Sequence, residues 1–205
     1  MRPLIRAVFL AVVATAALPV VRIPVDLLAA QDTLPVGFGS LRRDDIAVQL
    51  ATDQVAIQLL PLRESVIRLL APDTYASLRS LLAKHQTALD SIARQAGERH
   101  PLPVLVTFFG LVPNGHFVPE DLDLASSGQL YRPIGIVPLS PQWSSNQVDP
   151  RAQVIAIYLY DEDITLGQDL TVSYGSLSSD SWSHAVRLLD QERARVLSRA
   201  ASSPK

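Results

Sequence analysis

The sequence predicts an α+β fold, built mainly as an antiparallel β-sandwich with one long inserted helix and a second helix at the C-terminus. Residues 101–175 hold short apolar runs rich in β-branched and aromatic residues, with prolines in the segments between them. Residues 73–96 and 181–200 instead repeat apolar residues every three or four positions, which is typical of amphipathic helices. The two patterns together favour one β-rich domain with two packed helices.

The composition supports a single folded domain over residues 44–200. The chain has 205 residues, 48% of them hydrophobic, and a formal net charge of −2. This is enough apolar material for a core, and the charges are too few and too mixed to suit a phosphate backbone. We therefore expect no nucleic-acid partner.

The N-terminus has the pattern of a secretory signal. Two arginines precede an apolar run at 7–21, which is short for a transmembrane helix. We expect residues 1–30 to be a signal peptide, with cleavage after Ala16 or after Ala30, and a periplasmic or secreted product. The alternative is an uncleaved membrane anchor.

Cysteine is absent from the chain. Its absence excludes disulfides, thiolate metal sites and a cysteine nucleophile. An exported domain of this size without disulfides depends on its apolar core, which favours bacterial export.

The first half of the domain combines a hairpin with the long helix. Residues 31–43 contain two glycines and a proline and are predicted to be a linker. Apolar residues alternate at 46–50 and again at 55–59, which predicts a β-hairpin. The run at 65–70 fits either a strand or a helical turn. The helix at 73–96 then has Pro72 and Gly97 at its two ends.

The second half contains a strand with two apolar faces. Residues 153–160 are apolar on both sides, so we expect a second sheet against one face and the helix at 73–96 against the other. The serines and aspartate at 179–181 are good N-caps for the C-terminal helix. Residues 201–205 are predicted to be a disordered tail.

Several turn and core residues are shared with a known class of domain. They are the segment FVPEDL at 117–122, the segment LYRP at 130–133, the strand at 153–160 and the segment LTVSYG at 170–175. Residues 103–175 thereby resemble the immunoglobulin-like domains of exported bacterial proteins of unknown function. The resemblance implies a sandwich and supplies no catalytic residues.

The acidic stretch after residue 160 has two interpretations. A helix–loop–helix calcium site is excluded, because its glycine would come one position late and its twelfth position is a valine. A looser calcium site formed by Asp161, Asp163 and Asp169 is one alternative. The other is a solvated turn between a strand that ends at Tyr160 and one that begins near Leu170.

Three residues are candidates for ligand binding. Trp143 and Tyr131 fall in proline-rich loops, and loops at the end of a sandwich commonly form binding surfaces. The alternative for Trp143 is that its ring fills the end of the core. His116 follows an Asn-Gly pair and is the best exposed histidine candidate.

These patterns favour an exported, non-catalytic binding or cell-envelope interaction protein over an enzyme. Its expected partner is a protein or an envelope component, and no cofactor is expected apart from the calcium alternative. A second hypothesis is a periplasmic hydrolase acting on an envelope polymer, which needs a cleft that joins His116 to the acids at 120–123 or 161–163. A third is a membrane-tethered structural subunit, which would contact the membrane only through an uncleaved N-terminal segment.

Overall fold

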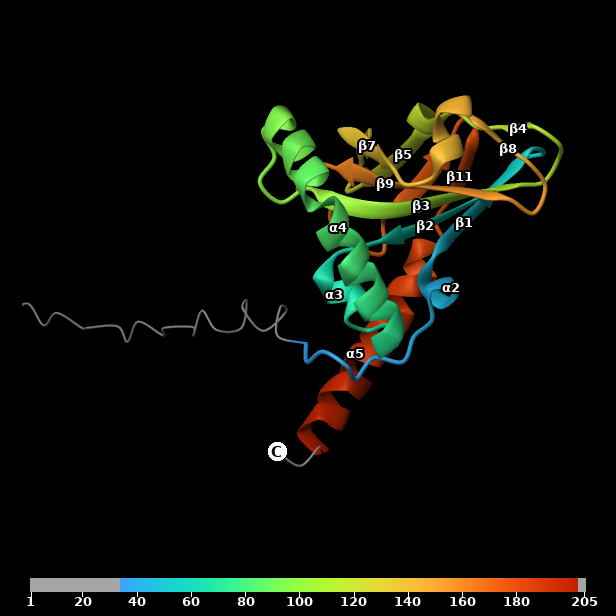
Figure 1. Cartoon of the computed structure of the whole chain (residues 1–205). Coiled ribbons are helices and arrows are strands. Elements are labelled where there is room, and N and C mark those ends of the chain that lie inside the picture. The colour runs from blue at the N-terminus through green and yellow to red at the C-terminus, as the bar shows by residue number, and fades with distance from the viewer. Residues whose placement is uncertain (1–33, 203–205) are drawn as a thin grey trace, which may run out of the picture.

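The protein is an α+β fold in which two antiparallel sheets pack against each other and helices cover the flanks. The computed structural model describes residues 34–202 (Figure 1). The predicted signal peptide and residues 203–205 of the predicted tail lie outside the described residues.

The larger sheet has five strands in the order β1-β2-β3-β9-β7, and every neighbouring pair is antiparallel. These strands are β1 (Val48–Ala51), β2 (Val55–Pro61), β3 (Leu102–Gly110), β7 (Gly135–Pro138) and β9 (Gln153–Tyr160). Strands β1 and β2 form the hairpin predicted from the alternating pattern, with Thr52 bonded across the turn to Val55. Ile46, the first residue of that pattern, instead ends a short helix.

The smaller sheet has four strands in the order β11-β10-β5-β6, and a separate two-stranded ribbon joins β4 to β8. The strands are β4 (Gly115–His116), β5 (Leu122–Ser126), β6 (Gln129–Tyr131), β8 (Gln147–Val148), β10 (Thr171–Tyr174) and β11 (Leu177–Ser179). Strand β9 ends at Tyr160 and β10 begins at Thr171, close to the bounds expected for the turn between them.

Two long helices and several short ones complete the fold. They are α2 (Arg43–Ile46), α3 (Glu64–Ile67), α4 (Pro72–Ala96), α5 (Trp182–Ser202) and the 3-10 turns η1 (Pro119–Asp121) and η2 (Pro141–Ser145). The ambiguous run at 65–70 thus begins in helix α3, which ends at Ile67, and Leu70 forms an isolated bridge with Leu41. Figure 1 shows α4 rising beside the sheets to reach β7, and α5 extending below them toward the C-terminus. Among residues 34–202, no helix has both the length and the apolar character needed to cross a membrane.

The main core lies between the two sheets, on the face of β9 that carries Tyr158 and Tyr160. Both rings are fully buried, and their hydroxyls donate hydrogen bonds to the backbone carbonyls of Pro119 and Leu122 across the interface. Burial raises the pKa of both phenols, so they act as neutral donors. The opposite face of β9 is turned toward α4, which confirms the expectation of a sheet on one side and a helix on the other.

The segment before β1 and helix α5 are joined by a buried carboxylate. Residues 34–43, which form most of the predicted linker, pack on the domain: Leu34 is buried and Leu41 pairs with Leu70. Glu192 of α5 is 0% exposed and accepts hydrogen bonds from the Ser40 backbone N–H at 3.0 Å and its hydroxyl at 2.8 Å. Arg199 donates to the same oxygen at 2.9 Å. This cluster fixes the lead-in segment against the C-terminal helix.

Candidate functional site

Trp143 lies inside the core at the end of the sandwich. Its side chain is 8% exposed, and its ring centroid lies 5.2 Å from that of Phe117, 5.9 Å from Phe108 and 6.1 Å from Tyr158. The turn η2 carries it there, next to strand β8. This arrangement matches the alternative in which the ring fills the end of the core.

Tyr131 and His116 lie in different surroundings from Trp143. Tyr131 is buried at the end of β6, and burial together with the charges of Asp161 and Asp163 raises its pKa. His116 is exposed on β4, and its backbone N–H donates to the Gln54 side chain at 2.9 Å. The structure does not gather these three ligand candidates into one cavity.

The predicted calcium ligands are engaged in the turn that follows β9. Asp161 accepts the Asp163 backbone N–H at 2.7 Å, and Asp169 accepts the backbone N–H and hydroxyl of Ser127. The hydrogen bond from the Ser127 backbone is the main reason why the pKa of Asp169 lies below its ordinary value. Within residues 34–202, no group of three or more histidines and carboxylates is arranged to hold a metal ion.

The two acidic clusters lie in separate cavities, and His116 lines neither of them. Glu120, Asp121 and Asp123 line one shallow cavity together with Arg132. Glu162 and Asp163 line another, beside helix α4. The convergence required by the hydrolase hypothesis is therefore not formed by these two cavities.

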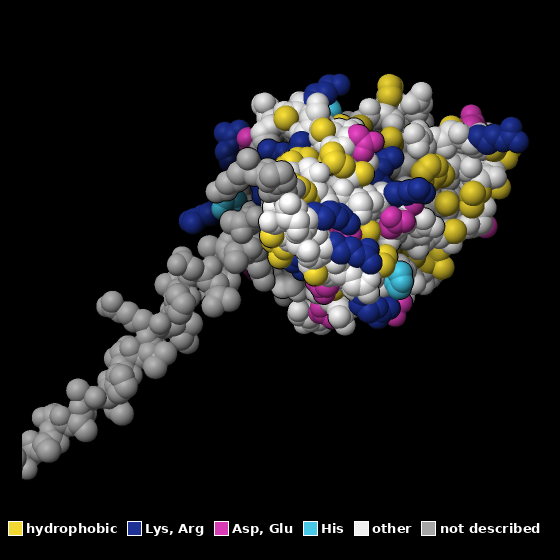
Figure 2. Space-filling model, turned by 90° about the horizontal axis from the view of Figure 1, so that it is seen from below, with side chains coloured by type: hydrophobic (Ala, Val, Ile, Leu, Met, Phe, Trp, Pro, Cys, Tyr) yellow, Lys and Arg dark blue, Asp and Glu magenta, His cyan; other side chains and the backbone are white. Residues whose placement is uncertain are grey.

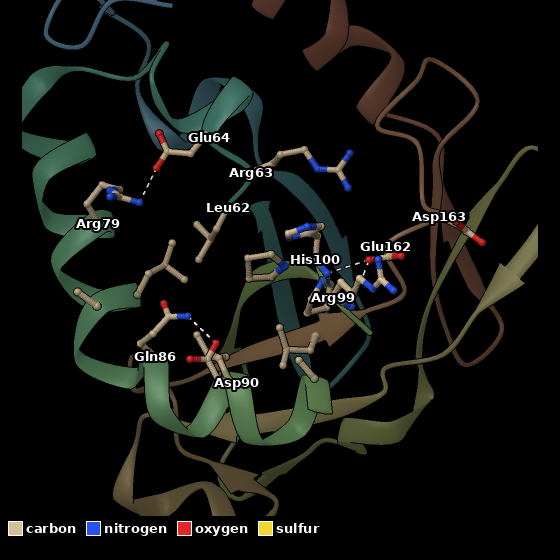
Figure 3. A pocket seen from close by; sticks show the side chains of 17 residues that line it. Leu62, Arg63, Glu64, Arg79, Gln86, Asp90, Arg99, His100, Glu162 and Asp163 are labelled. Carbon is tan, nitrogen blue, oxygen red and sulfur yellow. Dashed lines mark hydrogen bonds and ion pairs between the residues drawn. The ribbon is translucent and has the colours of Figure 1, made fainter. Parts of the chain in front are cut away.

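The cavity beside α4 is a large concave feature formed by the described residues. It has a volume of about 890 Å³, within the usual range for ligand sites. One wall is a single stripe of α4 that runs from Arg79 to Ala93. The facing wall is formed by the ends of strands and the segments that flank them, at 62–64, 99–103 and 159–163. We call this feature the α4 pocket (Figure 3).

The floor of the α4 pocket is aliphatic. Leu62, Leu159 and Leu89 are buried, and Pro103 and Leu82 extend the same surface. The sheet side of this floor is positioned by backbone hydrogen bonds, including one from Leu62 N–H to the Pro103 carbonyl at 2.8 Å. This hydrogen bond fixes the position of Leu62 relative to Pro103 on the sheet side of the pocket.

Helix α4 packs on the domain at several points along the pocket. Leu78 is buried toward one end, and Leu89 and Ala93 toward the other. Ala83 and Gln86, which lie between these contacts on the pocket side, are exposed. At the far end Ile92 packs so closely on Gly135 of β7 that a Cβ there would overlap it. The middle turns of α4, which carry Ala83 and Gln86, are therefore the part of the helix that is open to a ligand.

One end of the rim is an ion network centred on Glu64. Its two carboxylate oxygens pair with Arg68 at 2.7 Å and with Arg79 at 2.6 Å, and Tyr75 donates to it at 3.3 Å. The hydrogen bond with Glu64 is the main cause of the raised pKa of Arg68. Figure 3 shows the Arg79–Glu64 pair linking α4 to the facing wall.

The opposite part of the rim is organised by Glu162. Its carboxylate accepts the backbone N–H groups of Arg99 at 3.2 Å and His100 at 2.8 Å, which ties the end of β9 to the start of β3. The side chains of Arg99 and His100 are exposed, and no acceptor within residues 34–202 holds the Arg99 guanidinium. That guanidinium is available to a ligand.

The α4 pocket was not anticipated from the sequence, because its walls come from four separate segments of the chain. One signal was present: the helical stripe of α4 contains Leu82 and Leu89, but also has charged residues and alanine beside them. A stripe of that kind fits a helix that faces a cavity as well as one that faces a core.

Comparisons of the chain with protein-family models, with curated proteins and with solved structures give no match.

Proposed function

We propose that this chain is an exported, non-catalytic binding protein that acts at the cell envelope and holds its ligand in the α4 pocket. The observation that carries the proposal is the pocket itself, about 890 Å³ in volume, with an aliphatic floor and a charged rim. Preformed concave sites of this size and composition are typical of ligand-binding proteins. Export is proposed from the N-terminal pattern.

The proposal extends to the scaffold. We infer that the two packed sheets form an immunoglobulin-like sandwich, supported by the antiparallel pairing and the segments at 117–122 and 130–133. On this scaffold the binding site lies at the inserted helix, away from the loops that carry Trp143.

The experiment is a thermal-melt screen of the purified chain against short peptides, fatty acids, oligosaccharides and nucleotides. A ligand that binds only the folded state at 100 times its Kd stabilises it by about 2.7 kcal/mol, which raises Tm. We expect one class to raise Tm in the wild type and in Ala88→Trp, but not in Ala83→Trp. Both alanines are exposed on α4, and only Ala83 lines the pocket. An equal rise in both variants, or no rise with any class, would contradict the proposal.

A further inference from the structure

The shape of the α4 pocket fits a chain-like ligand. Its stripe on α4 runs from Arg79 to Ala93, which corresponds to about 21 Å along the helix axis at 1.5 Å per residue. An extended polypeptide covers that length with about six residues. The pocket is therefore long enough for a short segment of another protein.

The floor of the pocket suits the side chains of such a segment. Successive residues of an extended peptide point to opposite sides, so every second side chain faces the surface on which it lies. On the sheet side the floor offers Leu62 and Pro103, which are joined by a backbone hydrogen bond, and Leu159, which pairs with Pro103 across the strands. On the helix side it offers Leu82 and Leu89. Aliphatic side chains spaced two apart would be buried along it.

The rim suits a polymer of mixed character. Three arginines and four carboxylates line the pocket, in addition to His100. Nucleic acids require a basic track, and this rim has more carboxylates than arginines. Figure 2 shows the same mixture of basic, acidic and apolar groups over the face seen from below. A polypeptide carries charges of both signs beside apolar groups, so it complements such a rim.

The guanidinium of Arg99 is the rim charge that a ligand can pair with. Arg79 is paired with Glu64, and Arg63 donates to the Ile164 carbonyl at 3.4 Å. Arg99 is the pocket-lining arginine whose guanidinium contacts no acceptor in the described part of the chain. Figure 3 shows Arg99 beside His100, on the wall opposite α4. An acidic side chain of the ligand is its natural partner.

We propose that the α4 pocket binds an extended segment of a partner protein, about six residues long, with aliphatic side chains at alternate positions and an acidic residue opposite Arg99. This inference rests on the proposed function, and it names the ligand class of the same site.

The test is selection of an octapeptide display library on the full chain. We expect enriched peptides with aliphatic residues two apart and one acidic residue. Their binding is expected to fall at least tenfold in Ala83→Trp and in Gln86→Trp, and to be unchanged in Ala88→Trp. Arg99→Glu should replace the acidic preference with a basic one and keep the aliphatic pattern, whereas Arg187→Glu, on α5 outside the pocket, should change neither.

Each other outcome separates the two proposals. If no peptide is enriched, but a fatty acid or oligosaccharide raises Tm in a way that Ala83→Trp abolishes, the peptide proposal fails and the binding function stands. If the enriched sequences match a stretch of this chain, the occupant is a second copy of the chain, and the proposal of a different partner protein is refuted. If no compound of any class responds to Ala83→Trp, both proposals fail.

Discussion

Replacing Trp143 by alanine tests whether this ring stabilises the core or serves a ligand. The indole is 8% exposed and contacts the rings of Phe117, Phe108 and Tyr158. Truncation of a buried tryptophan to alanine costs about 3–5 kcal/mol, because apolar burial is lost and a cavity is left behind. The ring contacts contribute part of this, since aromatic pairs add about 0.5–1.5 kcal/mol each beyond burial.

The expected result is a large fall in thermal stability. In a domain of this size, each kcal/mol lowers Tm by about 2–4 °C, so Trp143→Ala should lower Tm by roughly 10 °C. Differential scanning calorimetry of the wild type and the variant measures this directly. Trp143→Phe keeps one aromatic ring at this position, so its fall in Tm should be clearly smaller than that of Trp143→Ala.

Leu130→Ala is the matched control, because Leu130 is a large apolar residue that is 56% exposed. It should leave Tm unchanged. An unchanged Tm in Trp143→Ala itself, together with weaker ligand binding, would refute the assignment of Trp143 to the core.

Three further predictions concern the lead-in segment and the acidic turn. Burial tends to raise the pKa of Glu192, but hydrogen bonds from Ser40 and Arg199 outweigh it and hold that pKa below its ordinary value. Its stabilising contribution is therefore present above the unfolded-state pKa of about 4.3 and is lost as pH falls through the lower folded pKa. Urea unfolding between pH 7 and pH 3 should show this loss in the wild type and a weaker pH dependence in Glu192→Gln; equal pH profiles would contradict it. Gly39→Ala should cost about 1–3 kcal/mol in the same assay, because its Cβ would overlap the backbone of Leu69 and Leu70. Exposed Val36→Ala is its control, and equal stability of the two variants would show that the segment is not held there. Calcium and EDTA should each leave Tm unchanged, because Asp161 and Asp169 already accept backbone hydrogen bonds; a rise with calcium that EDTA reverses would restore the calcium interpretation.

The strands and long helices were predictable because their patterns are local. Alternation at 46–50 and 55–59 predicted the β1–β2 hairpin, and the two apolar faces of β9 predicted cover on both sides. Ile46 belongs to the alternating pattern in the sequence, but in the structure it is the buried last residue of helix α2. An isolated apolar residue at the edge of an alternating run does not reveal which element it joins.

Side-chain burial outside regular elements could not be predicted from the sequence. A tryptophan in a proline-rich loop has the same local sequence whether it faces solvent or the core. Trp143 is buried because η2 folds back over Phe108 and Phe117, which are distant in sequence. Likewise, the three-residue spacing of Glu192 and Arg195 is typical of an exposed ion pair on a helix. The carboxylate is buried instead, because residues 34–43 cover it.

The α4 pocket was the least predictable feature, because a cavity forms where neighbouring elements do not pack closely, and the sequence of one element does not show this. Leu82 and Leu89 lie on one helical stripe, yet Leu89 is buried and Leu82 is only partly buried. Helix α4 contacts β7 and β9, and its position over these strands is set by tertiary contacts such as that of Ile92 with Gly135.

The most direct measurement of ligand occupancy in the α4 pocket is thiol protection. The chain contains no cysteine, so Ala83→Cys and Ala88→Cys each introduce a single thiol on the same helix. The rate of maleimide reaction is measured with and without the compound that raises Tm most in the screen. We expect slower reaction at position 83 and an unchanged rate at position 88. Equal rates at position 83 with and without the compound would show that the ligand binds elsewhere and would contradict the central claim.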